Sequence, residues 1–178
     1  WAEEVYGTGL VDEADAMTLH NYNYTSYPEE VAFDRIVRYK DLYYDLYGKY
    51  PEIHLTEWGY SAYRGIAQSE YIQGIYDIRQ YLYLVGKDVV DTLSYYDFAN
   101  DGAITTYLEH MHGAVQSQDA RVTEYPYAAK ESFAGFANMN KLLRNAECVQ
   151  EISDTEELFA FMYQRDDHEN VIAAWTQS

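Results

Sequence analysis

A repeated alternation of short apolar segments with longer helical patterns restricts how this chain can fold more than any other feature. The apolar segments begin near residues 16, 53 and 89. Between them, over 28–48 and 69–86, apolar residues recur at spacings of three and four. Alternating strand–helix units of this kind form a parallel sheet with helices packed against it. The sequence therefore predicts an α/β fold.

The expected boundaries follow from local signals. Pro28 with two acidic residues behind it predicts the start of the first helix, and Gly48 its end. Ser69 predicts the N-cap of the second. The third segment should be a strand over 89–96, followed by a long loop over about 99–126. A last helix is expected over about 127–145.

Three such units in a row favour a (β/α)8 barrel, in which the loop after every strand contributes to one shared site. A complete barrel needs about 250 residues, whereas this chain has 178. We therefore expect about three βα units from the C-terminal portion of a TIM barrel.

Polar and aromatic residues follow each predicted strand. The second strand ends on Glu57, followed by Trp58 and Gly59. Glutamate is a poor strand former, and a buried carboxylate costs free energy unless it is paired. Because barrel strands end at the active-site face, the pattern predicts that Glu57 belongs to a site. The other two clusters are His20-Asn21-Tyr22-Asn23-Tyr24 and Asp97, Asn100, Asp101 and Gly102.

After Asn145 the predicted secondary structure changes from alternating strands and helices to short strands. Short strands are predicted over 148–152 and 158–164, and again at 171–175 after an acidic turn. We therefore assign residues 1–146 to the barrel and residues 147–178 to the beginning of an all-β accessory domain with antiparallel strands.

The amino-acid composition limits the classes of partner that the chain can be expected to bind. Twelve Lys and Arg against thirty Asp and Glu give a net charge of −18, which argues against nucleic acid and anionic membranes as partners. No run is long enough to span a membrane. A neutral carbohydrate is compatible with this charge, and the 21 tyrosines offer flat faces for stacking on sugar rings as well as for packing. Cys148 is the single cysteine, so no internal disulfide can form.

Other chemistry finds little support. Glu109, His110 and His112 have an alternate spacing suited to a metal, but a third and fourth ligand are not evident. The acidic turn at 166–170 is interpreted as a solvated turn rather than a calcium site. Ser61 and Ser94 lack a G-x-S-x-G context, and no glycine-rich phosphate loop is present. We predict no metal and no cofactor.

Taken together, the motifs at the three strand ends resemble the C-terminal half of a clan-A retaining glycoside hydrolase. These motifs are His20-Asn21-Tyr22, Thr56-Glu57-Trp58-Gly59 and Tyr95-Tyr96-Asp97-Phe98-Ala99-Asn100-Asp101-Gly102. Glu109-His110 and residues 126–130 resemble the closing loop and final helix of that barrel. The resemblance covers about residues 15–145, and the later strands resemble the start of the β-sandwich that often follows such barrels.

The resemblance implies an enzyme that cleaves O-glycosidic bonds with retention of configuration. The nucleophilic glutamate of the clan, at the end of the seventh strand, maps onto Glu57. A His-x-Tyr pattern after the sixth strand, which positions that glutamate and the sugar, maps onto His20 and Tyr22. The implied substrate contacts are His20, Asn21, Tyr22, Tyr24, Trp58, Tyr96 and Asp101. The compartment is left open, with a secreted or periplasmic location favoured over the cytoplasm.

The chain departs from the clan in two places. The eighth strand of the clan commonly ends in a tryptophan, whereas the aromatics here are Tyr95, Tyr96 and Phe98. The acid/base glutamate of the clan lies in an Asn-Glu pair after the fourth strand, and this sequence has no such dipeptide. The expected partner is therefore the N-terminal part of the barrel or a second copy of the chain, and the fragment alone is expected to be inactive.

Two alternatives remain open at this stage. A degenerate barrel that keeps its aromatic cleft but lacks the acid would be a non-catalytic carbohydrate-binding protein. A purely structural fragment would instead pair Glu57 with a nearby cation, for which Arg64 is the nearest candidate in the sequence.

Overall fold

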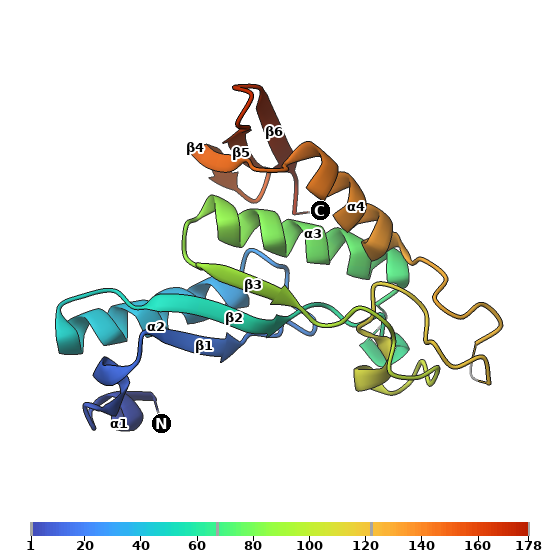
Figure 1. Ribbon diagram of the computed structural model, residues 1–178, viewed down its shortest axis with the longest axis horizontal. Helices are drawn as coiled ribbons and strands as arrows, with labels where there is room; N and C mark the ends of the chain where they lie inside the picture. The colour runs from blue at the N-terminus through green and yellow to red at the C-terminus, as the bar shows by residue number, and fades with distance from the viewer. Residues whose placement is uncertain (1, 67, 122, 178) are drawn as a thin grey trace.

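The computed structural model describes residues 2–66, 68–121 and 123–177 (Figure 1). This part of the chain contains four α-helices, three 3-10 helices (denoted η) and two three-stranded sheets. In chain order the elements are α1 (Ala2–Tyr6), η1 (Leu10–Glu13), β1 (Ala16–His20), α2 (Val31–Tyr47), β2 (Glu52–Trp58), η2 (Arg64–Ile66), α3 (Glu70–Gly86), β3 (Thr92–Tyr95), η3 (Leu108–Met111), α4 (Glu131–Leu142), β4 (Glu147–Thr155), β5 (Leu158–Gln164) and β6 (Asn170–Trp175).

The first sheet is parallel, in the order β1-β2-β3, as the alternation of strands and helices predicts. Thr18 lies beside His54, which lies beside Thr92, and the next residues in register are all leucines. Because side chains alternate between the two faces of a strand, one face of this sheet is apolar. The other face carries the two exposed threonines and the half-buried His54.

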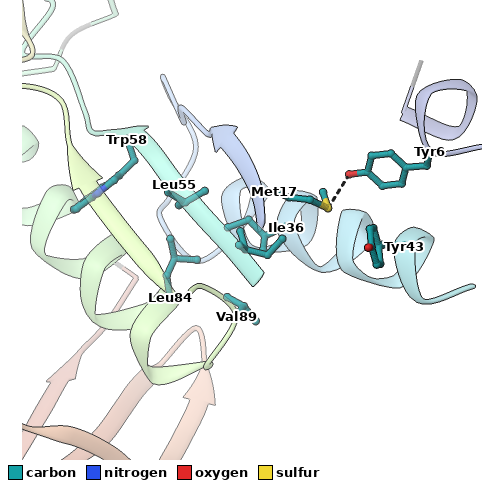
Figure 2. Close-up of a cluster of buried hydrophobic side chains, with 9 residues drawn as sticks. Tyr6, Met17, Ile36, Tyr43, Leu55, Trp58, Leu84 and Val89 are labelled. Atoms are coloured by element: carbon teal, nitrogen blue, oxygen red, sulfur yellow. Dashed lines mark hydrogen bonds between the residues drawn. The ribbon is translucent and has the colours of Figure 1, made fainter. Parts of the chain in front are cut away.

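Helices α2 and α3 both pack on the apolar face. Figure 2 shows Ile36 of α2 and Leu84 of α3 close to Leu55 of β2. The cluster extends towards α1, where the hydroxyl of Tyr6 donates to the sulfur of Met17 at 3.4 Å. The fully or nearly fully buried members of this cluster are Tyr6, Met17, Ile36, Tyr43, Ile53, Leu55, Trp58, Leu84 and Val89.

The second sheet is antiparallel, in the order β4-β5-β6, with the predicted turn joining the last two strands. It packs on the side of α3 that faces away from the parallel sheet (Figure 1). Phe161 of β5 is fully buried there beside Leu82 and Met139, and the hydroxyl of Tyr163 donates to the carbonyl of Leu82 at 2.7 Å. Helix α3 therefore lies between the two sheets.

Three predicted elements have boundaries that differ from the structure. Helix α2 begins at Val31 instead of Pro28, because Glu29 turns inward from residues 28–30 to pair with Arg79. The strand expected from residue 89 begins at Thr92. Helix α4 is shorter at both ends than 127–145, since Tyr127 and Asn145 adopt positive φ angles of 58° and 56° that a right-handed helix excludes.

The start of α3 agrees with its prediction. The side chain of Ser69 accepts a hydrogen bond from the backbone N–H of Ile72 at 3.2 Å and so caps the helix. Over the residues that the structure describes, no helix combines the length and the apolar character needed to cross a bilayer.

Candidate active site

Glu57 lies at the carboxyl end of β2, and two side chains from the end of β1 surround its carboxylate. The hydroxyl of Tyr22 donates to Glu57 Oε2 at 3.0 Å, and His20 Nδ1 lies 3.2 Å from the same oxygen. Sheet pairing sets this proximity, since His20 is the register partner of Glu57. With its side chain 37 % exposed, Glu57 is open to a ligand while the Tyr22 hydroxyl donates to it and His20 contacts it.

The contact predicted between Glu57 and the residues after β1 is therefore present. The alternative of a purely structural fragment predicts that Glu57 pairs with a nearby cation, for which Arg64 was the candidate. Among the described residues, the basic side chain in contact with the Glu57 carboxylate is that of His20 and not that of Arg64. The backbone N–H of Arg64 instead donates to the carbonyl of Thr105 at 3.0 Å.

The rings of Tyr22, Tyr24 and Tyr96 lie together and form an aromatic wall beside Glu57. The ring of Tyr24 stacks on that of Tyr22 with centroids 6.0 Å apart and an interplanar angle of 6°. Tyr96, which follows β3, meets Tyr22 edge-on at 6.3 Å. Tyr24 is 46 % exposed, so it offers a flat apolar surface of the kind that stacks on sugar rings.

Two of these tyrosines remain protonated donors. Burial, followed by the hydrogen bond to the Glu57 carboxylate, raises the pKa of Tyr22 well above its ordinary value. The hydrogen bond to Asp101, at 2.8 Å, is the main reason that the pKa of Tyr96 is raised. Asp101 is exposed and lies on the loop after β3. Tyr96 thus joins that carboxylate to the aromatic wall.

His112 is a member of this group that the sequence did not predict, having been considered only as a metal ligand. Its ring lies 5.4 Å from that of Tyr22 and 5.6 Å from that of Tyr96, and it is only 1 % exposed. Burial lowers the pKa of His112 to about 4, so the imidazole is neutral near pH 7. No local pattern identifies such a residue, because it reaches the site through a distant loop.

Buried side chains hold the loop that carries His112. Lys130, at the N-terminus of α4, places its ammonium nitrogen 3.2 Å from the carbonyl of Met111 and 2.6 Å from that of Gly113. Gln73 of α3 donates to the carbonyl of His112 at 2.8 Å. Burial lowers the pKa of Lys130 to about 8. Three successive carbonyl groups are therefore bound by side chains from two helices.

The structure does not bring two of the predicted substrate contacts to this surface. Trp58 is 1 % exposed and points into the core (Figure 2). There its ring meets that of Tyr95 edge-on at 5.5 Å. Asn21 is also 1 % exposed, because its amide donates to the carbonyl of Ala32 and accepts from Arg35. Neither side chain presents a surface to a sugar, so both are removed from the proposed contacts.

A metal centre has no geometric basis in the described ranges, where no group of three or more His, Cys, Asp or Glu side chains is arranged to hold an ion. The site contains a partly exposed carboxylate that accepts from Tyr22 and contacts His20, next to the aromatic wall. This arrangement suits binding of a neutral polyhydroxylated ligand and attack by the carboxylate.

Comparison with known structures shows that the fold of this chain is similar to part of a glycoside hydrolase. One matching structure is a family 39 glycoside hydrolase from the gut symbiont Bacteroides cellulosilyticus WH2, with a TM-score of 0.75 and 21 % sequence identity. The match covers 98 % of this chain and 36 % of that enzyme, so the chain spans little more than a third of its length. Comparisons with protein-family models and with curated proteins found no match.

Proposed function

We propose that this chain is the C-terminal portion of the catalytic (β/α)8 barrel of a retaining glycoside hydrolase, with Glu57 as the nucleophile. The observation that carries the proposal is the placement of Glu57 at the carboxyl end of a parallel strand, 3.0 Å from the Tyr22 hydroxyl and 3.2 Å from His20. The glycoside hydrolase found by structural comparison supports it at the level of the fold. On this proposal, residues 1–146 belong to the barrel and 147–178 to an accessory β domain.

The chemistry proceeds in two displacements. Glu57 attacks the anomeric carbon and forms a glycosyl ester, while an acid protonates the departing oxygen. Water then attacks the anomeric carbon from the face opposite the ester and displaces the Glu57 carboxylate. The residue that acted as the acid in the first step now acts as a base and takes the proton of this water. The hydrogen bond from the Tyr22 hydroxyl and the contact with His20 fix the direction in which the carboxylate attacks.

The acid/base residue belongs, on this proposal, to a preceding part of the barrel. Two observations support that assignment. The sequence has no Asn-Glu dipeptide, and the matched glycoside hydrolase is much longer than this chain. The substrate contacts proposed within the chain are His20, Tyr22, Tyr24, Tyr96 and Asp101.

The test is Glu57→Gln in the full-length protein, assayed on a panel of aryl glycosides. Loss of a nucleophile from catalytic machinery that acts as a unit should lower kcat by at least about 10³-fold. Glu52→Gln is the matched control, because Glu52 lies on the same strand with its side chain 64 % exposed and outside the site. The control should retain its kcat.

A second variant separates attack from positioning. In Glu57→Ala, added azide should restore turnover and give a glycosyl azide of inverted configuration, since the small anion can occupy the space of the carboxylate. Turnover retained in Glu57→Gln would remove Glu57 from the mechanism. If the wild-type protein binds glycosides but hydrolyses none of the panel, the carbohydrate-binding alternative replaces the proposal.

A further inference from the structure

Asp77 is a carboxyl group enclosed between the ends of the parallel strands and helix α3. It is 0 % exposed. Its Oδ1 accepts a hydrogen bond from the backbone N–H of Tyr60 at 2.8 Å, and its Oδ2 lies 2.8 Å from the hydroxyl of Tyr95. Within the described ranges, no Lys, Arg or His nitrogen lies within ion-pairing distance of this carboxyl.

The Tyr95 hydroxyl lies between two acceptors but carries one proton. Its oxygen is 2.8 Å from Asp77 Oδ2 and also 2.8 Å from the carbonyl oxygen of His112. If Asp77 is ionised, only one of these contacts can contain a proton, and the other brings two acceptor oxygens together. If Asp77 carries a proton, it donates to Tyr95 and Tyr95 donates to His112, so each contact is a hydrogen bond.

Gln73 does not supply the missing proton. Its amide nitrogen lies 3.5 Å from the Tyr95 oxygen, whereas it lies 2.8 Å from each of the carbonyls of Tyr60 and His112. The amide has two N–H groups, and those two shorter contacts use both. Ser132 also interacts with the Tyr95 hydroxyl, but a donor to the Tyr95 oxygen places no proton between that oxygen and the carbonyl of His112. The proton count of the two 2.8 Å contacts therefore depends on Asp77.

We propose that Asp77 is a protonated carboxylic acid in the native protein near pH 7 and that, in this neutral form, it is a positioning residue for the site around Glu57. The positioning half of this inference rests on the proposed function. The protonation half concerns the folded chain alone.

Asp77 acts on Glu57 along two routes. Its bond to the N–H of Tyr60 fixes the backbone just after β2, the strand that carries Glu57. Its bond to Tyr95 completes the hydrogen bond that holds the carbonyl of His112. The ring of His112 in turn lies 5.4 Å from that of Tyr22, which donates to Glu57.

The surroundings favour the neutral form. Burial raises the pKa of Asp77 to about 8, opposed in part by the N–H of Tyr60 and the hydroxyl of Tyr95. Lys130, which faces it from the start of α4, is the charged group that lowers this pKa. The ammonium of Lys130 is itself satisfied by neutral oxygens of Asn100, Met111 and Gly113 rather than by a carboxylate.

Infrared spectroscopy of the full-length protein at pH 7 tests the protonation directly. The difference between wild type and Asp77→Asn should contain the C=O stretching band of one carboxylic acid. Asp97→Asn is the matched control, because burial raises the pKa of Asp97 only to about 6 and the group is mostly ionised at pH 7. Absence of this band from the difference spectrum overturns the proposal.

The pH dependence of stability gives a second readout. Because the folded pKa is raised above the value of 3.8 for an ordinary aspartate, the contribution of Asp77 to stability is complete below about pH 4 and is lost as the pH rises to about 8. Asparagine reproduces the donor and acceptor of the protonated acid and does not titrate. The Tm of wild type minus that of Asp77→Asn should therefore fall between pH 5 and 8, and parallel curves would contradict protonation.

Should Asp77→Asn fail to fold, the difference between wild type and Asp77→Leu is measured instead, because the protonated acid/base residue of the full-length protein is common to both and cancels. The positioning role is tested by Asp77→Leu, which has no donor or acceptor. The kcat of Asp77→Leu on aryl glycosides should be about 10- to 100-fold lower than that of Asp77→Asn. Equal kcat values would reject positioning, whereas turnover retained in Glu57→Gln would reject the proposed function and leave the infrared result unaffected.

Discussion

The hydroxyl of Tyr22 donates to Glu57 at 3.0 Å, while its ring is held by Tyr24, Tyr96 and His112. Tyr22→Phe removes the donor and keeps these ring contacts. A hydrogen bond to a charged group contributes about 1.5–3 kcal/mol, and each 1.36 kcal/mol of barrier is a factor of ten in rate. We therefore expect kcat on aryl glycosides to fall about 10- to 100-fold.

Tyr44→Phe is the control for that variant, because Tyr44 is exposed on helix α2. It should leave kcat and Tm unchanged. If Tyr22→Phe also keeps the wild-type kcat, the hydroxyl has no part in orienting the carboxylate, and the role proposed for Tyr22 is wrong.

At the level of elements, a buried ion pair connects the turn before α2, helix α3 and strand β6. Arg79 donates to both oxygens of Glu29, at 2.8 Å and 2.7 Å, and the indole N–H of Trp175 donates to the same carboxylate at 2.6 Å. The side chains of Arg79 and Glu29 are 8 % and 2 % exposed. This contact fixes the loop of Tyr22 and Tyr24 relative to the second sheet.

Breaking this pair from one side should be costly. Glu29→Gln leaves the Arg79 guanidinium buried without its counter-charge, a change that typically costs about 3–5 kcal/mol. Trp175→Phe removes one donor and should cost about 1–3 kcal/mol. Urea unfolding measures both. Glu30→Gln is the control, since Glu30 is exposed and only accepts from Gln177 at 3.0 Å. Equal stability of Glu29→Gln and Glu30→Gln would contradict the structural role.

For the whole molecule, the parallel sheet has one helix-covered face and one uncovered face. Thr18 and Thr92 are exposed on the uncovered face, and the outer edges of β1 and β3 have no strand partner among the described residues. Unpaired edges promote association with other chains, and barrel closure removes them. We propose that the preceding part of the barrel covers this face.

The chain produced by itself should therefore self-associate or aggregate, whereas co-production with the preceding part should give a soluble complex. Size-exclusion chromatography with light scattering measures the association state, and the uninterrupted full-length protein is the control. A soluble monomer of the 178-residue chain that melts cooperatively would contradict this expectation.

The sequence alone determined the order and type of the main elements and the partners of one carboxylate. Helix α3 begins at its predicted cap, because Ser69 needs only the N–H of Ile72 one turn away. The contact of Glu57 with His20 and Tyr22 was expected from the resemblance to clan-A glycoside hydrolases, and it agrees with the rule that neighbouring parallel strands end at the same edge of a sheet.

Only the tertiary structure decided which side chains face the site and which lie behind it. Trp58 follows Glu57 directly, yet strand alternation and the packing of α3 and α4 turn it into the core. His112, Asp77 and Lys130 come from separate segments and meet only when helices and loops pack. Their burial, which sets their charge states, is a property of that packing and has no local signature in the sequence.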